Sequence, residues 1–145
     1  YHPHMGTVVQ TASEVETLMA RTSPAVFLLL DTGHLTFAGG DPVAAARRHG
    51  ARIAHVHAKD IRRPVLDAVL RDDTPFLEAV LQGVFTVPGD GCIDYPGVFT
   101  ELARHGYSGW VVVEAEQDPK MAEPLKYATM GFKNVTASMR AAGLG

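Results

Sequence analysis

The sequence predicts an α/β protein that forms the C-terminal part, with about five strands, of a (β/α)₈ barrel. Short apolar runs alternate with helical segments along the whole chain, which is the pattern of parallel strands joined by helices. The expected strand ends are regularly spaced: His4, Asp31, His57, Val87 and Glu114 are 27, 26, 30 and 27 residues apart. This spacing is close to the roughly 31 residues per βα unit of a barrel of ~250 residues.

Three of the strands are defined by apolar residues, and they are expected at Ala25–Leu30, Arg52–His57 and Trp110–Val113. Runs without polar alternation are typical of parallel strands that are buried on both faces. A weaker strand is expected at Val84–Val87, before the turn that begins at Pro88. Trp110 and Phe99 are interpreted as core residues.

Helices are expected between and after the strands, at Ser13–Arg21, Asp41–His49, Phe76–Gln82, around Val98 to Ala103, and from Asp118 towards Arg140. Asp41 supplies an N-cap and Pro42 a proline in the first turn, while Gly50 is a stop signal. The pair Asp118-Pro119 is interpreted in the same way, as the start of the last helix.

Residues 1–145 are expected to form a single domain that lacks about three N-terminal βα units. An eight-stranded barrel cannot close with five strands, and a long open edge would be a liability. A doubly wound open sheet of five strands is the structural alternative, because its βα pattern is the same in sequence. No Gly-x-Gly-x-x-Gly pattern follows the first strand, which argues against a dinucleotide-binding version of that fold.

Composition favours a globular protein with a small-molecule partner. Of the 145 residues 46% are hydrophobic and 20% are charged, and the net charge of −3 with scattered Lys and Arg argues against a nucleic-acid partner. The single cysteine, Cys92, cannot form an internal disulfide, and no apolar run approaches the roughly 18 residues of a membrane span. We therefore expect a cytoplasmic protein with no membrane partner, and a homo-oligomer is compatible with these features.

Metal-competent side chains gather at the expected strand ends: His2 and His4, Asp31 and His34, His55 and His57, Glu114 and Glu116. In a parallel barrel these ends meet at one rim, where catalytic residues lie. One imidazole and two carboxylates from three strands form a mixed nitrogen and oxygen site that suits Mn²⁺, Co²⁺ or Fe²⁺, and zinc less exclusively.

Each candidate also has a structural interpretation. Asp31, followed by Thr-Gly, could simply accept backbone hydrogen bonds at a turn. His55 and His57 point to one face of their strand, and we expect His55 to be a hydrogen-bonded interior residue and His57 to be the ligand. Glu114 follows three valines, where an unpaired carboxylate would be costly, so it needs a cation or hydrogen-bond donors.

These residues carry a resemblance. The strings Asp31-Thr-Gly-His34, His55-Val-His57-Ala-Lys59-Asp60, Pro88-Gly-Asp-Gly91 and Gly106-Tyr-x-Gly-Trp110 occur in the order seen in the xylose-isomerase-like TIM barrels. The longer strings Tyr1-His-Pro-His-Met-Gly-Thr7, Gly83 to Gly91 and Val113 to Pro119 resemble the inosose dehydratases within that superfamily. The similarity covers nearly the whole chain.

The resemblance implies a set of site residues. It assigns Asp31, His57 and Glu114 as metal ligands. His2 is the expected fourth ligand, because the superfamily usually has a Glu at the end of the preceding strand and His2-Pro3-His4 stands there instead. Substrate-binding roles are implied for His4 and Arg63, and the position of His34 contacts substrate in related epimerases. The implied cofactor is a divalent metal ion, Mn²⁺ or Co²⁺, and glutathione is compatible with the resemblance.

The implied activity is that of a hydro-lyase, which removes water from 2-keto-myo-inositol through a metal-stabilised enediolate in inositol breakdown. A base takes the proton beside the ketone, and a general acid helps the β-hydroxyl to leave. His34, Lys59 and Glu116 are the candidates for proton transfer, and the sequence does not assign base and acid among them. Lys59 could equally pair with Asp60 or Glu114 as structural charge balance.

Three other functions remain open. A metal-dependent sugar isomerase or epimerase would use the same enediolate and return the proton to a neighbouring carbon. Phosphodiester cleavage like that of endonuclease IV would need further His ligands and a basic surface, which the net charge of −3 disfavours. A truncated barrel fragment without catalytic activity is the alternative outside enzymes.

Overall fold

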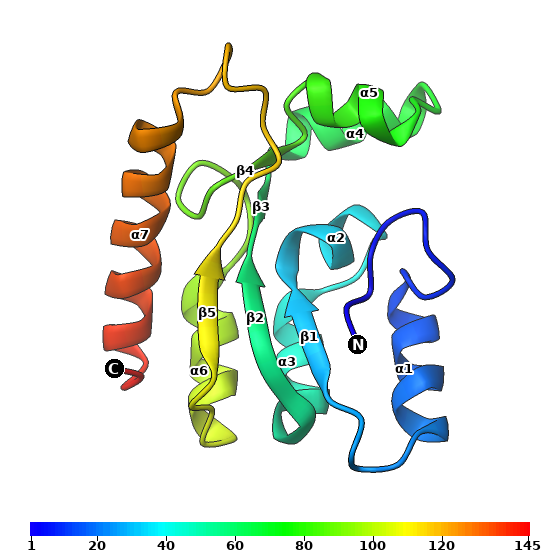
Figure 1. Cartoon of the computed structure of the whole chain (residues 1–145), viewed down its shortest axis with the longest axis vertical. Helices are drawn as coiled ribbons and strands as arrows, with labels where there is room; N and C mark the ends of the chain where they lie inside the picture. Colours follow the sequence, from blue (N-terminus) through cyan, green and yellow to red (C-terminus); the bar gives the residue numbers. More distant parts are fainter.

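The computed structural model describes all residues, 1–145, and its centre is a three-stranded parallel sheet (Figure 1). The strands are β1 (Leu28–Asp31), β2 (Ile53–Ala58) and β5 (Trp110–Val113), in the spatial order β1-β2-β5. Each of the three apolar runs identified in the sequence therefore forms a strand, and the predicted α/β class with a parallel sheet is confirmed.

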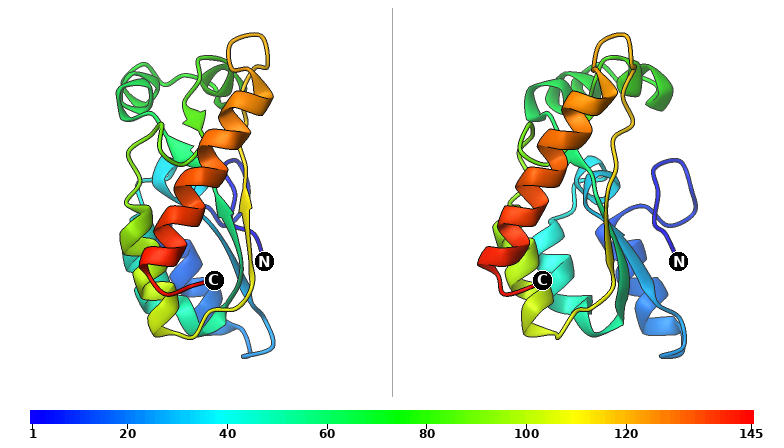
Figure 2. Two further views of the ribbon diagram at one scale, coloured as in Figure 1. Left: turned by 90° about the vertical axis from the view of Figure 1, so that its left-hand side faces the viewer. Right: turned by 60° about the vertical axis from the view of Figure 1, so that its left-hand side comes forward.

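Most helices lie on one side of this sheet, as the side views of Figure 2 show. They are α1 (Ala12–Arg21), α3 (Pro42–His49), α6 (Tyr95–Arg104) and α7 (Pro124–Ala141). At the carboxyl ends of the strands lie α2 (Thr32–Phe37), α4 (Arg63–Arg71) and α5 (Phe76–Leu81), and a 3₁₀ turn, Gly50–Arg52, leads into β2. None of the helices combines the length and apolar character needed to cross a membrane.

The hydrophobic core lies between the sheet and this helix layer. Leu28 and Leu30 of β1 and Val56 of β2 are almost fully buried there. They pack with apolar residues of α1 and α6, including Phe99, which is fully buried as predicted. Burial of such side chains contributes about 1.5–3 kcal/mol each, so this layer holds the strand ends in fixed positions.

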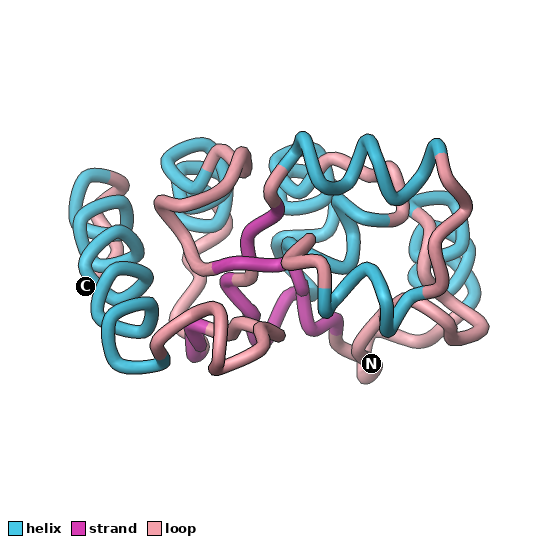
Figure 3. The backbone as a smooth tube through the Cα atoms, turned by 90° about the horizontal axis from the view of Figure 1, so that it is seen from above, coloured by secondary structure: helices cyan, strands magenta, loops and turns pink.

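The other face of the sheet is open. The register pairs His55 with Trp110 and His57 with Val112, so these side chains project from the face away from the helices. Trp110 is 78% exposed and Val112 is 39% exposed. The prediction that β5 is buried on both faces and that Trp110 belongs to the core is therefore wrong, because no other layer of the chain packs against this face (Figure 3).

Two of the five expected parallel strands are not in the parallel sheet. The predicted strand at Val84–Val87 exists as β4 (Phe85–Thr86), but it pairs antiparallel with β3 (Asp60–Ile61), and β2 pairs directly with β5. The reason is the path of the chain: α4 and α5 stay at the carboxyl end of the sheet, so the chain returns from that end (Figure 1).

The N-terminal residues are also no strand, so His4 does not end one. Only Tyr1 runs along β1: its carbonyl accepts from Leu29 N at 2.8 Å and its amino group donates to the Phe27 carbonyl at 2.7 Å. The chain then turns, with Thr7 N donating to the His4 carbonyl. The hydrogen bonds at Tyr1 nevertheless tether the His2 to His4 segment beside β1.

Side chains cap the starts of α1, α3 and α7, but the predicted start of the last helix is wrong. Thr11 and Glu14 form a capping box at α1, and Asp41 accepts from Val43 N at the start of α3. The last helix does not begin at Asp118-Pro119 as predicted; α7 begins at Pro124, with the Glu123 side chain as its cap. Asp118 accepts from Lys120 N in a separate turn instead.

Candidate active site

Three strand ends bring an imidazole and two carboxylates together. The register places Asp31 beside His57, and Glu114 follows β5 with its N–H donating to the Ala58 carbonyl at 3.3 Å. These residues have the same parity on neighbouring strands, so their side chains project from the same, helix-free face. The predicted convergence of the strand ends at one rim is thus present in the structure.

The distances between the donor atoms fit a single metal ion. His57 Nδ1 is 2.8 Å from Glu114 Oε2 and 3.4 Å from Asp31 Oδ2. His2 Nε2 is 3.4 Å from the same Asp31 oxygen. Two ligand atoms that are each about 2.1 Å from one ion lie about 3.0 Å apart at a right angle and about 3.4 Å apart at the tetrahedral angle.

The same four donor atoms lack hydrogen bonds. His2 Nε2, Asp31 Oδ2, His57 Nδ1 and Glu114 Oε2 are buried atoms without a hydrogen-bond partner, and Glu116 Oε2 is the fifth. Buried polar atoms are nearly always satisfied in native proteins, because leaving them unpaired is costly. Ligand atoms of Asp31, His57 and Glu114 lie within 4.8 Å of one another, and His2 contacts the same Asp31 oxygen, so the residues present fit a divalent ion.

The charges in this cluster shift the pKa values of two ligands. Burial alone would raise the pKa of Asp31, but the imidazoles of His2 and His57, each 3.4 Å away, and the charge of Lys59 hold it well below its ordinary value. The contact with the Asp31 carboxylate raises the pKa of His57, and the nearby Glu114 carboxylate adds to this while burial opposes it. Asp31 is therefore a ready anionic ligand.

The three candidates for proton transfer lie beside these donors. Lys59 Nζ is 3.0 Å from His34 Nε2 and 3.1 Å from Glu116 Oε2, and its side chain is 1% exposed. Burial lowers the pKa of His34 to about 3, despite the nearby Asp31 carboxylate. His34 is therefore a neutral imidazole at physiological pH. Lys59 contacts Glu114 as well, whereas no contact of its side chain with Asp60 is present.

His4 lies beside the three candidates for proton transfer, and Arg63 does not. The ring of His4 lies against that of His34, with centroids 3.6 Å apart, and its Nδ1 contacts the Met5 carbonyl at 2.7 Å. Arg63 is exposed and lines a hollow of about 230 Å³ that no residue of the cluster shares. The predicted substrate contact of Arg63 stays a prediction without support from its position.

His55 differs from the expectation of a hydrogen-bonded interior residue. It is half-buried, its ring centroid is 5.3 Å from that of His57, and its side chain makes no hydrogen bond. It lies one step deeper on the open face of β2, away from the ligand atoms. The expectation that His57 and not His55 faces the other candidate ligands agrees with this geometry.

Two residues that support Lys59 were missed in the sequence. Lys59 Nζ lies 5.0 Å from the centre of the Phe85 ring, a cation–π arrangement. A Cβ at Gly33 would lie 2.7 Å from Lys59 Cγ, so only glycine leaves room for the lysine stem. The glycine of the Asp31-Thr-Gly string was visible in sequence, but its role depends on a contact with the end of β2 that spacing does not reveal.

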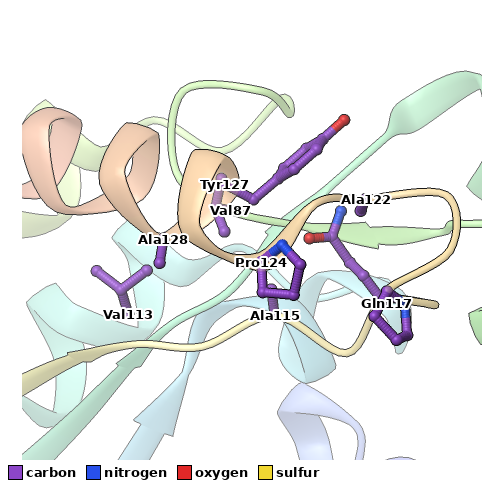
Figure 4. A pocket seen from close by; sticks show the side chains of 9 residues that line it. Val87, Val113, Ala115, Gln117, Ala122, Pro124, Tyr127 and Ala128 are labelled. Atoms are coloured by element: carbon purple, nitrogen blue, oxygen red, sulfur yellow. The ribbon is translucent and has the colours of Figure 1, made fainter.

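Side chains point alternately to opposite sides of the segment that follows β5, and this separates the cluster from the pocket shown in Figure 4. Glu114 and Glu116 face the cluster, while Ala115 and Gln117 line a pocket of about 200 Å³ against α7. Tyr127 and Val87 complete its wall, and the lining is mostly apolar. No metal-competent side chain lines this pocket, so the chemistry belongs to the other side of the segment.

Residues 1–133 match the family described as xylose isomerase-like TIM barrel. The chain belongs to this family. It is 57% identical over 134 residues to Inosose dehydratase 2 of Bacillus cereus, which covers 92% of this chain and 45% of the relative. It is 54% identical over 143 residues to the Rhizopine catabolism protein MocC of Rhizobium meliloti, covering 99% of this chain and 44% of the relative.

Solved xylose isomerase-like barrels share the fold at lower identity. A structure described as the IOLI protein with a binding zinc atom superimposes with a TM-score of 0.64 at 21% identity, over 94% of this chain and 46% of that protein. The chain spans a little less than half the length of the curated relatives that it matches. The structure is accordingly an α/β partial barrel of this family.

Proposed function

We propose that this chain carries the metal site and the proton-transfer groups of an inosose dehydratase, a hydro-lyase that removes water from 2-keto-myo-inositol. The observation that supports this most is the convergence of Asp31, His57 and Glu114, whose facing atoms lack hydrogen-bond partners, beside a buried lysine and histidine. The 57% identity to a protein named inosose dehydratase supports the choice of reaction within the family.

His2, Asp31, His57 and Glu114 would hold the ion. Two imidazole nitrogens and two carboxylate oxygens suit Mn²⁺ or Co²⁺, and zinc remains a candidate because a solved structure of the same fold is described with zinc. A divalent cation there would act as a Lewis acid on the substrate carbonyl. No residue of the cluster indicates a role for glutathione, so the proposal includes the metal ion alone.

Glu116 is our candidate for the general acid. Its Oε2 is the fifth buried atom without a hydrogen-bond partner, and it lies 3.1 Å from Lys59 Nζ. The side chain is one-third exposed. After a base removes the proton beside the ketone, the electron pair moves onto the carbonyl oxygen. When that pair returns, the bond to the β-hydroxyl breaks. Glu116, once it has taken up the proton that the base removed, passes it to the hydroxyl, which leaves as water.

His34 is our candidate for the base. Its low pKa keeps the imidazole neutral at physiological pH. The Lys59 ammonium donates to the Nε2 lone pair, so His34 would accept the substrate proton there only after this contact opens. Lys59 Nζ contacts both His34 Nε2 and Glu116 Oε2, and so fixes the distance between the two proton-transfer groups. The assignment of base and acid stays part of the proposal.

Replacement of Glu116 by Gln tests the reaction. In the full-length protein Glu116→Gln should retain the metal ion and still exchange the substrate α-proton with D₂O, while dione formation falls by about 10²–10⁴-fold, the usual worth of a general acid. NMR follows the exchange and absorbance follows the dione in one sample. Glu114→Gln is the matched control, because it should lose metal as well.

The two steps separate the alternatives. Loss of both exchange and dione formation in Glu116→Gln, with metal retained, would reassign Glu116 as the base. Undiminished dione formation would remove Glu116 from the mechanism. An isomerase or epimerase would show exchange and a stereoisomeric or isomeric ketose in the unmodified protein, without any dione.

We also propose that residues 1–145 are one part of a longer barrel that continues with further βα units. The open face of the sheet, which carries Trp110, Val112 and the half-buried His55, supports this proposal. In a closed barrel this face is the interior, packed by layers of side chains.

A further inference from the structure

Lys59 lies between two groups of metal-competent atoms. On one side its Nζ is 3.5 Å from Asp31 Oδ2 and 3.3 Å from Glu114 Oε2, both atoms of the proposed metal site. On the other side it is 3.0 Å from His34 Nε2 and 3.1 Å from Glu116 Oε2. The ammonium therefore contacts three carboxylates and one imidazole while being 1% exposed.

The fold holds this ammonium in place. A Cβ at Gly33 would lie between 2.7 and 2.9 Å from three carbons of the Lys59 side chain, which is too close for two carbon atoms that are not bonded. The Thr32 hydroxyl donates to the Lys59 carbonyl at 2.8 Å and accepts from Lys59 N at 3.2 Å. A side chain fixed along its whole length is expected where the position of its charge matters, because ordering a lysine costs up to about 2 kcal/mol of conformational entropy.

The second group of atoms could itself bind a cation. His4, His34 and Glu116 each offer one ligand atom, and these three atoms lie within 4.8 Å of one another. His34 Nε2 and Glu116 Oε2 are 3.7 Å apart. This is less than the about 4.2 Å that two ligands span on opposite sides of an ion with bonds of about 2.1 Å.

We propose that the Lys59 ammonium is a fixed cation that fills a second metal position formed by His4, His34 and Glu116, and so limits the centre to one divalent ion. The charges agree with this: Asp31, Glu114 and Glu116 carry three negative charges, which one divalent ion and one ammonium balance. Without the ammonium the same carboxylates would attract a second ion.

This arrangement bears on the kind of substrate. Two ions about 3.5–4 Å apart stabilise both oxygens of a displacement at phosphorus. One ion beside a lysine offers a single Lewis acid and a hydrogen-bond donor, which suits an uncharged keto-polyol. The inference rests on the proposed metal site for the first ion, but the two can fail separately, since each ion has its own donor residues.

The test counts bound ions in variants of the full-length protein. Lys59→Ala removes the charge and opens space, so it should bind two Mn²⁺ ions per chain by dialysis and elemental analysis. Lys59→Met removes the charge but fills the space, so it should bind one, as the unmodified protein does. The double variant Lys59→Ala with Glu116→Gln should return to one. Paired ions in Lys59→Ala should also give a coupled Mn²⁺ spectrum in paramagnetic resonance.

The outcomes decide between the two proposals. One ion in both the unmodified protein and Lys59→Ala, with native circular dichroism, overturns the fixed-cation proposal and leaves the first site standing. No ion in the unmodified protein but one in Lys59→Ala, lost again with Glu116→Gln, overturns the first site alone. If Lys59→Ala does not fold, Lys59→Val keeps the Cβ and Cγ atoms that lie against Gly33 and leaves the ammonium position empty, so two ions are again expected.

Discussion

Metal binding at this centre should release a proton at pH values below the raised pKa of His57, because His57 is protonated there when no ion is bound. The contact with the Asp31 carboxylate raises the pKa of His57 above its ordinary value of 6.5, and the Glu114 carboxylate adds to the effect. An imidazole must be neutral to bind a metal ion. Affinity for the ion should therefore rise with pH up to the raised pKa of His57 and level off above it.

The magnitude follows from the groups that titrate. Because His57 must lose its proton before it binds the ion, the affinity falls tenfold for each pH unit below the pKa of His57, or by about 1.4 kcal/mol. His34 has a pKa of about 3 and stays neutral above about pH 5.5. Asp31, with its pKa below the ordinary value of 3.8, stays ionised over the same range. Neither His34 nor Asp31 cancels the effect of His57 on metal affinity. Below the pKa of His57, the slope of log affinity against pH should therefore be at least one.

Titration calorimetry of the full-length protein with Mn²⁺, between about pH 5.5 and 8, measures this slope. Repeating each titration in two buffers of different ionisation enthalpy gives the number of protons released. His55→Ala is the matched control, because His55 lies on the same strand face without contacting a ligand atom, and it should leave the slope unchanged. Constant affinity over this range, or binding without proton release at about pH 6, would refute the reasoning.

Two further predictions concern the ligand and the frame that holds it. His57→Ala should reduce bound Mn²⁺ or Co²⁺ strongly in elemental analysis, whereas His49→Ala, which alters a residue that faces Glu16 beside α1, should not; equal metal content in both would end the assignment. Gly131→Ala places a Cβ 2.6 Å from Val113 Cγ1, which should push α7 from β5 and lower the free energy of unfolding by about 1–3 kcal/mol. The exposed Lys133→Ala should have little effect on urea unfolding, and an unchanged midpoint for Gly131→Ala would show that α7 shifts at no cost.

The sequence predicted the three strands of the parallel sheet, because an apolar run that stops at a polar residue is typical of a buried strand reaching the rim of its sheet. Trp110–Val113 has the predicted bounds. Spacing gives no strand direction, however, so Phe85–Thr86 was counted as parallel although it pairs antiparallel with Asp60–Ile61. The start of the last helix was within reach: a helix from Asp118 would contain Pro124 in its interior, where proline lacks the needed N–H.

The alternation of side chains along the strands predicted which residues meet at the site. It did not predict which of them contact one another. Asp31, His57 and Glu114 end neighbouring strands and so had to converge. The position of Lys59 could not be predicted, because a long flexible side chain reaches either Asp60, Glu114 or Glu116 from the same backbone. What fixes it is the lack of a side chain at Gly33, a contact between residues 26 positions apart.

The exposed indole of Trp110 gives this protein a built-in optical probe. Trp110 is the only tryptophan, and at 78% exposure its emission reports water contact at the amino end of β5. Four residues of extended strand separate it from Glu114, or about 13 Å. An ion at the carboxyl end is too far to alter the solvent around the indole, whereas any layer that covers the open face must displace that water. Emission colour therefore distinguishes closure of the barrel interior from occupation of its rim.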